Sequence, residues 1–245
     1  MIVNFRRIQG ATIDGRHIKD KMLYRSGNLT TYTQEDIRMM RECHIKHIID
    51  LRSDEECAVH PYRLPDDFNV HHVSALKTKG GLENFYFLML LDKDSTAEEI
   101  QAAASYVREG YRILPMHNPA LKRILSIMTQ EEGAILFHCS SGKDRTGVLA
   151  ALLQKLLGIK DDEIMKEYLI SNDYIHEETL HFADEIGFQG SQRDTLMYVC
   201  HVHPELLQSS FAEVEKYYPD YTLFFQKEYG LDTDKIARLK ERYLE

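Results

Sequence analysis

The hydrophobic spacing of the chain changes abruptly in its second half. Residues 134–137 form a continuous apolar run after Gly133, which predicts a short buried strand. Apolar residues then recur at helical spacing over 146–157, and Gly158 stands where a helix C-cap belongs. A tight polar loop, 139–145, joins the two segments. The pattern therefore predicts a loop that leads from the end of a strand into the N-terminus of a helix.

The remaining segments show the same two kinds of pattern. Runs rich in β-branched residues predict strands at 4–13, 22–25, 45–51 and 68–73. Capping signals and amphipathic stripes predict helices after Thr33 and Pro119 and over 97–114, 161–171, 177–186, 191–202, 204–217, 223–229 and 234–243. No repeat or low-complexity linker interrupts them, so we expect a single domain over 1–245.

One segment of the first half stands out by its composition. Residues 82–91 are far more apolar than their neighbours, but the run is too short to cross a bilayer. Because it lacks polar periodicity, two interpretations stay open: a mobile helix that closes over a site, and ordinary core. We expect the wider interval 76–113 to act as a lid or specificity insertion.

The overall composition is that of an ordinary globular protein. Hydrophobic residues make up 43% and charged residues 28% of the 245 residues, and the formal net charge is −9. This acidic balance argues against nucleic-acid binding and against a general affinity for anionic membranes, since both need a basic surface. The sequence shows neither a signal peptide nor the ~20 apolar residues of a membrane span. We expect a soluble, cytoplasmic protein, although export by a specialised secretion system would leave no such signal.

Neither the cysteines nor the histidines suggest a metal site. The four cysteines are Cys43, Cys57, Cys139 and Cys200. Their wide spacing favours a reducing compartment over a disulfide framework. His176 and His181 are one residue too far apart for the zinc-protease motif, so their rings would lie on different faces of a helix. We predict no metal and no other cofactor.

The loop between the predicted strand and helix suits an anion and contains a nucleophile. A helix N-terminus carries unpaired N–H groups and a partial positive charge, which favour a phosphate or a thiolate. Cys139 lies in this field near Lys143 and Arg145, and such surroundings lower a thiol pKa from about 8.5 to between roughly 3.5 and 7.5. Arg145 follows Cys139 by six residues, far enough for a loop to curl round one oxyanion. Small residues between them let the backbone N–H groups turn inward: Ser140, Ser141 and Gly142.

Two other interpretations of this loop fit less well. A nucleotide-binding loop needs a glycine where Phe137 stands and a magnesium-binding hydroxyl where Asp144 stands. A buried structural cysteine would not require Cys, Gly, Lys, Asp, Arg and Thr together in this order. The loop is therefore expected to be a catalytic phosphate site.

The stretch 138–147 reads His-Cys-Ser-Ser-Gly-Lys-Asp-Arg-Thr-Gly and contains a Cys-x5-Arg signature. In this form it resembles the loop of the bacterial atypical tyrosine phosphatases, which include enzymes of protein and phosphoinositide specificity. Further stretches are similar to that family in the same order: 4–6, 23–27, 49–53, 167–172 and 203–245. The resemblance implies a cysteine-phosphatase-like α/β fold, with a central, mostly parallel sheet of about four to five strands flanked by helices and a helical C-terminal half.

Loop chemistry and resemblance together suggest a role for each residue. The Cys139 thiolate is expected to attack phosphorus and form a phosphocysteine, while Arg145 and nearby backbone N–H groups hold the phosphate oxygens. The resemblance implies that Thr146 donates a hydrogen bond to the departing sulfur and that His138 orients the loop. The expected phosphate-binding residues are Ser140, Ser141, Gly142, Lys143 and Thr146.

A general acid must protonate the leaving oxygen. Many tyrosine phosphatases place it after a tryptophan on a separate loop, and this chain has no tryptophan. Asp144 is the nearest carboxylate, and the resemblance implies that the aspartate here is the acid; its alternative role is to supply charge at the helix N-terminus. The reserve candidates are Asp66, Asp67, Asp92 and Asp94.

Two further features leave alternatives open. Lys143 could bind a second phosphate of a phosphoinositide, or it could simply balance the charge of Asp144. Asp50 and Arg52 follow a predicted strand, at the edge where open α/β sheets bind ligands. They could contact phosphate, or they could form a salt bridge that fixes the next loop.

The sequence favours a phosphomonoester hydrolase that acts on phosphotyrosine in proteins and extends to phosphoserine and phosphothreonine. The alternative is a phosphoinositide phosphatase on the same scaffold, and a phosphate-binding module without turnover fits less well. The expected partners are phosphoprotein or phosphoinositide substrates, with no nucleic acid and no integral membrane association.

Overall fold

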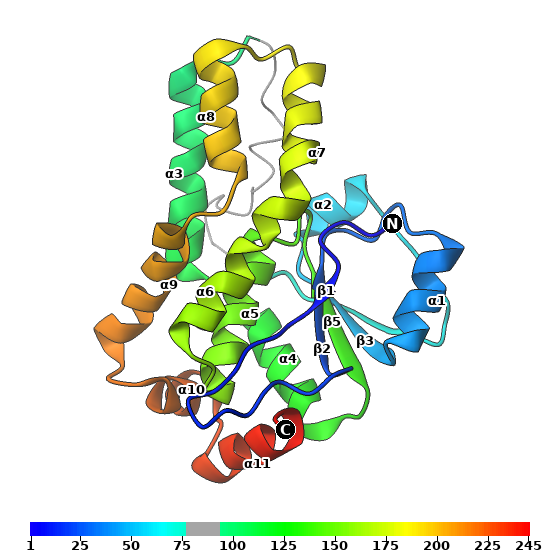
Figure 1. Cartoon of the computed structure of the whole chain (residues 1–245), viewed down its shortest axis with the longest axis vertical. Coiled ribbons are helices and arrows are strands. Elements are labelled where there is room, and N and C mark those ends of the chain that lie inside the picture. The colour runs from blue at the N-terminus through cyan, green and yellow to red at the C-terminus, as the bar shows by residue number, and fades with distance from the viewer. Residues whose placement is uncertain (77–93) are drawn as a thin grey trace.

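The computed structural model describes residues 1–76 and 94–245, and Figure 1 shows a sheet surrounded by helices. The strands are β1 Arg6–Arg7, β2 Leu23–Ser26, β3 Ile45–Asp50, β4 Asn69–His72 and β5 Ala134–His138. Their order is β1-β2-β5-β3-β4, and every neighbouring pair is parallel except β1 with β2. The predicted α/β fold with a mostly parallel sheet is confirmed.

β5 lies at the centre of the sheet and is buried along its whole length. A strand covered on both faces needs no polar alternation, which explains the continuous apolar run in the sequence. Its last residue, His138, lies beside Ser26 of β2 and Asp50 of β3. The loop that follows therefore leaves the sheet between the carboxyl ends of two parallel neighbours, where α/β folds bind ligands.

Helices make up most of the C-terminal half, as predicted. The helices are α1 Gln34–Glu42, α2 Asp54–Val59, α3 Ala97–Ile113, α4 Pro119–Gln130, α5 Asp144–Leu157, α6 Asp161–Leu169, α7 Ser171–Glu185, α8 Gly190–Cys200, α9 Pro204–Tyr217, α10 Tyr221–Tyr229 and α11 Thr233–Tyr243. In Figure 1, α3, α7 and α8 stand together above the sheet, and α8 contacts both of the others. α10 and α11 lie at the opposite end.

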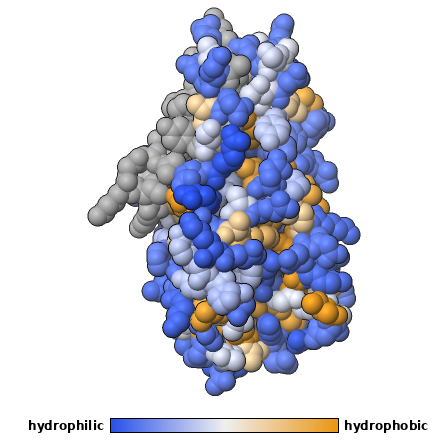
Figure 2. Space-filling view, turned by 90° about the vertical axis from the view of Figure 1, so that its left-hand side faces the viewer, coloured by the Kyte–Doolittle hydropathy of each residue, from blue (hydrophilic) through white to orange (hydrophobic). Residues whose placement is uncertain are grey.

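The two faces of the sheet bury separate apolar clusters. Ile49 and Phe137 belong to the larger cluster, which includes most of α5, whereas Ile48 and Leu136 belong to a smaller cluster with α1. α5 ends at Gly158, whose φ of 84° forms the predicted left-handed C-cap. The face shown in Figure 2 is mainly hydrophilic, with apolar side chains in small groups. None of the helices described for 1–76 and 94–245 is both long and apolar enough to cross a membrane.

Two strand and helix predictions are wrong near the N-terminus. The predicted strand at 4–13 shrinks to β1. Asn4 before it has a φ of 55° and binds a distant loop through its side chain, and Gly10 after it has a φ of 140°, so neither end of the segment continues the strand. α2 is missing from the prediction, since its six residues are too few to show a helical period.

One helix boundary in the C-terminal half is also wrong. α7 begins at Ser171, directly after α6, and not at 177. Asn172 stands in its first turn, where the side chain donates to the Val202 carbonyl oxygen at 2.9 Å. The predictions for 82–91 lie outside the described residues, and the lid assigned to 76–113 stays a prediction.

Candidate active site

The loop after β5 is shorter than predicted. It covers 139–143, and α5 begins at Asp144 with Lys143 in the N-cap position. Asp144 and Arg145 therefore stand in the first helical turn, where an acidic side chain complements the positive end of the helix dipole. Both side chains are buried, and both line the same pocket as Cys139.

The carbonyl oxygens of residues 140–142 are bound from behind the loop. The Asn28 backbone N–H donates to the Ser140 oxygen at 2.7 Å. Asn4 Nδ2 donates to the Ser141 and Gly142 oxygens at 3.1 and 3.0 Å. Arg25 Nη2 also donates to the Gly142 oxygen, at 2.8 Å. In the parts of the chain that the structure describes, the amide N–H groups of 140–144 have no hydrogen-bond acceptor. This row of donors is therefore available to an anion.

Glycine is required at position 142. Its φ is 69°, and a Cβ there would lie 2.3 Å from the Ser26 carbonyl oxygen. The missing side chain lets the loop lie directly against the end of β2.

Two buried arginines connect the back of the loop to α6. Arg6 Nε and Arg25 Nη1 each lie 2.8 Å from an oxygen of the Glu167 carboxylate, and Ser171 Oγ accepts from both arginines. Burial, followed by the nearby charge of Arg25, lowers the pKa of Arg6 to about 10, so Arg6 stays charged at neutral pH. Because two guanidinium groups share one carboxylate, a net positive charge lies behind the loop and favours an anion in front of it. Three of the stretches that carry the family resemblance meet here.

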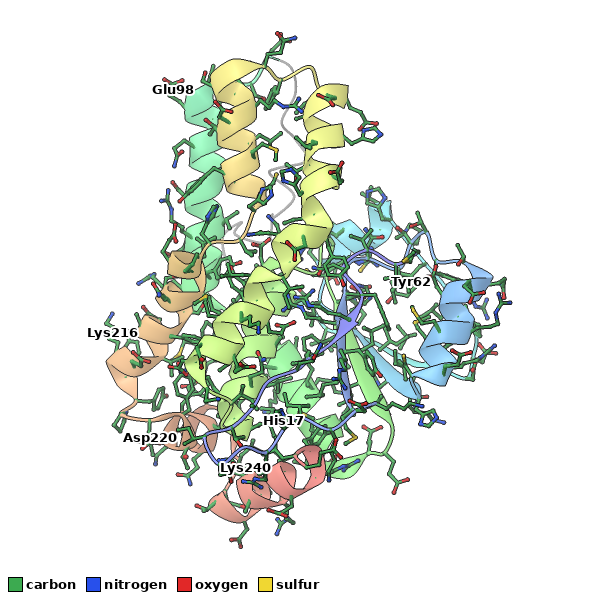
Figure 3. All side chains as sticks on the ribbon, viewed as in Figure 1. His17, Tyr62, Glu98, Lys216, Asp220 and Lys240 are labelled. Carbon is green, nitrogen blue, oxygen red and sulfur yellow. The ribbon has the colours of Figure 1, made fainter. Side chains whose placement is uncertain are left out.

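The thiol of Cys139 has a donor of its own. Thr146 Oγ1 lies 3.1 Å from Cys139 Sγ, on the first turns of α5. His138 is fully buried, with Nδ1 3.2 Å from the Cys139 carbonyl oxygen and Nε2 2.8 Å from Oη of Tyr62, which is labelled in Figure 3. Burial lowers the pKa of His138, so the ring is neutral, donates through Nδ1 and accepts from the tyrosine.

Sequence reasoning missed the residue that holds Arg145. Glu56 of α2 accepts from Arg145 Nη1 at 2.5 Å and from Nη2 at 2.8 Å, and it also accepts from Ser140 Oγ at 2.5 Å. Burial alone would raise the pKa of Glu56, but the hydrogen bonds and charge of Arg145 lower it to about 2. The carboxylate is therefore ionised and orients the guanidinium that faces the pocket.

Comparison with known proteins agrees with this geometry. A family model described as "Tyrosine phosphatase family" matches residues 1–245. The chain belongs to the tyrosine phosphatase family. It is 33% identical over 153 residues to a tyrosine-protein phosphatase of Nostoc commune, an alignment that covers 62% of this chain and 48% of the relative. It is 29% identical over 170 residues to the triple specificity protein phosphatase PtpB of Mycobacterium tuberculosis, with 62% of each chain covered.

The chain thus spans about half to three fifths of the length of these curated relatives. Among solved structures, the core catalytic domain of the PP-IP phosphatase SIW14 from S. cerevisiae is 16% identical and has a TM-score of 0.35. That alignment covers 74% of this chain and 91% of the yeast domain. A likeness this distant carries no argument about the site.

Asp50 and Arg52 form a buried salt bridge in this tyrosine phosphatase family member. Arg52 Nη2 lies 2.7 Å from Asp50 Oδ2, and Arg52 Nη1 donates to the His60 carbonyl oxygen at 2.9 Å. Neither residue is among those that line the pocket in the described parts of the chain. Of the two alternatives, the structure therefore supports the pair that fixes the loop before β4.

Asp144 is bound on one oxygen by a residue that the sequence did not indicate. The Tyr111 hydroxyl, from α3, donates to Asp144 Oδ1 at 2.8 Å. Lys143 Nζ donates to the Cys200 carbonyl oxygen and lies 3.6 Å from Asp144 Oδ2. Lys143 therefore links the loop to the end of α8 and also faces the carboxylate.

The other candidate acids lie elsewhere. Asp67 pairs with Arg41 at 2.8 Å, on the exposed surface. Asp66, Asp67 and Asp94 are not among the pocket-lining residues of the described chain, and Asp92 lies outside the described residues.

The pocket itself has a volume of about 300 Å³. Its floor is formed by the loop and by the start of α5. Its walls come from the N-terminal segment, α2, α7 and α8, through Val3, Glu56, Ile175, Thr179, Phe182 and Cys200. A charged floor and a largely apolar wall therefore meet around Cys139.

Proposed function

We propose that this chain hydrolyses phosphomonoesters through a phosphocysteine on Cys139, with phosphotyrosine in proteins as its substrate. The observation that carries the proposal is the row of amide N–H groups at 140–144 for which the described residues supply no acceptor, next to the Cys139 thiol in one pocket. Such a row suits three equatorial phosphate oxygens, with Arg145 as the charged partner.

In the proposed first step, the Cys139 thiolate attacks phosphorus in line. The S–P bond forms as the bond from phosphorus to the leaving oxygen breaks, and Asp144 transfers its proton to that oxygen. In the second step, water attacks the phosphocysteine, Asp144 takes a proton from the water, and the thiolate departs. The Thr146 hydroxyl, 3.1 Å from Sγ, stabilises the sulfur as it becomes negative.

The pocket wall supports phosphotyrosine as the substrate. Val3, Ile175 and Phe182 provide apolar surface suited to a phenyl ring above the phosphate site. Among the described residues that line the pocket, the cations are Lys143 and Arg145, and both already contact other groups of the chain. Lys143 is also the one observation that favours the second candidate, a phosphoinositide phosphatase, since a multiply phosphorylated ring needs a second cation.

Rates on a phosphotyrosine peptide and on a phosphoinositide in vesicles would test the proposal. We expect the peptide to be the better substrate and Cys139→Ser to be inactive on both, because serine cannot supply a thiolate. Full activity in Cys139→Ser would end the covalent mechanism. Phosphate binding without turnover in the wild-type chain would favour the non-catalytic module, and preference for the vesicle would favour the second candidate.

We also propose that the chain acts in a reducing compartment such as the cytoplasm. Cys43, Cys57, Cys139 and Cys200 are all free thiols, and the mechanism requires Cys139 to stay reduced.

A further inference from the structure

Two buried tyrosines form a chain of hydroxyl groups behind Asp144. Tyr111 comes from α3 and Tyr168 from α6, and both are fully buried. Their hydroxyl oxygens lie 2.6 Å apart, and Tyr111 Oη lies 2.8 Å from Asp144 Oδ1. Nothing in the mechanism above uses either residue.

The direction of these hydrogen bonds follows from the number of protons. Each tyrosine hydroxyl carries one, and the proton of Tyr111 is donated to the carboxylate. Tyr168 must therefore donate to Tyr111, so that the chain runs from Tyr168 through Tyr111 to Asp144. Burial first, and the charge of Asp144 second, raise the pKa of both tyrosines well above 10, so both protons are present at neutral pH.

The surrounding helices hold the backbone of Tyr111 and the ring of Tyr168. The Tyr111 carbonyl oxygen would normally accept from the residue four positions later, but that residue is Pro115 and has no N–H. Ser210 of α9 supplies the missing donor, with Oγ 2.7 Å from the Tyr111 oxygen. The ring of Tyr168 packs against Gly147 of α5, where a Cβ would come within 3.0 Å of the ring.

The two oxygens of Asp144 are therefore not equivalent. Oδ1 is committed as an acceptor from Tyr111, whether or not the carboxyl is protonated. Lys143 Nζ stands 3.6 Å from Oδ2, which is longer than a hydrogen bond, and donates to the Cys200 carbonyl oxygen instead. Oδ2 is the oxygen left to carry a transferable proton.

We propose that Tyr111, supported by Tyr168, is a positioning residue that fixes the orientation of Asp144 and keeps its acidic proton on Oδ2. The inference rests on the proposed function, in which Asp144 is the general acid. Tyr111 acts only through Asp144 and touches no substrate.

Its test uses Tyr111→Phe and a series of aryl phosphates with leaving groups of increasing pKa. Proton donation matters most for a poor leaving group, so kcat/KM should fall about tenfold on phenyl phosphate but less than about twofold on p-nitrophenyl phosphate. Tyr168→Phe removes only the outer donor and should change the rate on phenyl phosphate by about two- to threefold. Tyr229→Phe is the matched control. The Tyr229 hydroxyl donates to the Pro115 carbonyl oxygen at 2.6 Å, and Tyr229 does not line the pocket in the described chain, so the variant should leave both rates unchanged.

The double variant Tyr111→Phe/Asp144→Asn separates positioning from a general structural effect. If Tyr111 acts through Asp144, then Tyr111→Phe should add no further loss on phenyl phosphate in the Asp144→Asn background. Equal losses on both substrates, or additive losses in the double variant, would overturn the inference. Should Tyr111→Phe fail to fold, Tyr168→Phe is tested in the same two ways: by whether its loss is larger on phenyl phosphate, and by whether that loss disappears in the Asp144→Asn background.

The same experiment distinguishes the two proposals. If Asp144→Asn lowers the rates on phenyl phosphate and p-nitrophenyl phosphate by the same factor, the general-acid assignment fails, and the role of Tyr111 fails with it. If Asp144→Asn has that effect and Tyr111→Phe does not, the proposed function stands and the inference is wrong.

Discussion

The loop 139–143 has two sides that are built in different ways. The pocket side consists of neighbours in sequence, since Cys139, Arg145 and Thr146 fall within one strand–loop–helix unit. The back consists of residues from remote segments: Asn4 and Arg25 come from the N-terminal part of the chain, and Glu167 comes from α6. The difference indicates that the pocket side of the loop depends mainly on local sequence, while the shape of the loop depends on the whole fold.

A second contrast follows from burial and charge. On the pocket side, the amide donors have no partner in the described chain, and on the back every loop carbonyl from 140 to 142 is bound. Changes at the back should therefore cost mainly stability, and changes on the pocket side should cost mainly rate. Glu56 is the exception to examine, because it lies outside the loop yet holds Arg145.

The largest expected effect is on stability, at the back. Arg25→Met should lower the free energy of unfolding by about 3–5 kcal/mol, because it leaves Glu167 and the Gly142 carbonyl oxygen buried with fewer partners. Urea unfolding followed by circular dichroism measures it. Arg16→Met is the control, since Arg16 pairs with two carboxylates where Arg25 pairs with one, but is partly exposed, and it should cost less than about 1 kcal/mol. Equal losses of unfolding free energy in the two variants would contradict the special contribution of the residues behind the loop to stability.

The next effect is the acid dependence of stability that comes from Glu56. Its pKa is about 2 in the folded chain against an ordinary value of 4.5, so its contribution is fully present above 4.5 and is lost as the pH falls toward 2. The loss should approach roughly 3 kcal/mol over this window. Unfolding free energies measured from pH 6 down to pH 2 should show it in the wild-type chain and less steeply in Glu56→Gln. Parallel curves would contradict the assigned ion pair with Arg145.

A smaller effect is expected on rate from the same residue. Glu56→Gln should lower kcat/KM on a phosphotyrosine peptide by about 100-fold, because Arg145 loses the carboxylate that orients its guanidinium. Glu55→Gln changes the exposed neighbour on the same helix and should stay within about twofold of wild type. If both variants retain full activity, Arg145 is oriented by other groups.

The smallest effect concerns the second chemical step. Thr146→Val should slow hydrolysis of the phosphocysteine by about tenfold, since the departing sulfur loses its hydrogen bond from Oγ1. Rapid-quench measurements should show accumulation of the phosphoenzyme. Thr129→Val is the control, because the Thr129 hydroxyl donates to the Leu125 and Ser126 carbonyl oxygens of its own helix, and it should leave the step unchanged. A slower first step with no accumulation would place the role of Thr146 in binding instead.

The parts of the fold that the sequence predicts well are those with a strong local pattern. The central strand, the helix that ends at Gly158 and the helix over 204–217 all lie within two residues of their predicted bounds. Glu56 shows that such local patterns do not predict contacts between distant segments. Ser53 and Glu56 form a capping box that can be read in the sequence, but a capping box does not reveal that the same carboxylate reaches Arg145, 89 residues away.

The tyrosines illustrate the same limit. In the sequence, Tyr111 and Tyr168 occupy ordinary inward positions of amphipathic helices, and their aromatic rings are typical of core residues. That their hydroxyls meet each other and Asp144 depends on how α3, α5 and α6 pack, which no local period encodes. Likewise, Asp50 and Arg52 left two interpretations open because a salt bridge and a ligand site use the same residue types.

Gly147 has a consequence for the mutational tolerance of this chain. A Cβ at this position would lie 3.0 Å from the Tyr168 ring and 3.2 Å from Arg25 Nη2, so both buried networks border this glycine and would have to shift to admit a side chain. Both neighbours are held by hydrogen bonds and have little room to move. In a library randomised at 147, any larger residue would have to displace the tyrosine pair, the arginine, or both. The position should therefore accept almost no replacement, although glycine contributes no side chain to the site.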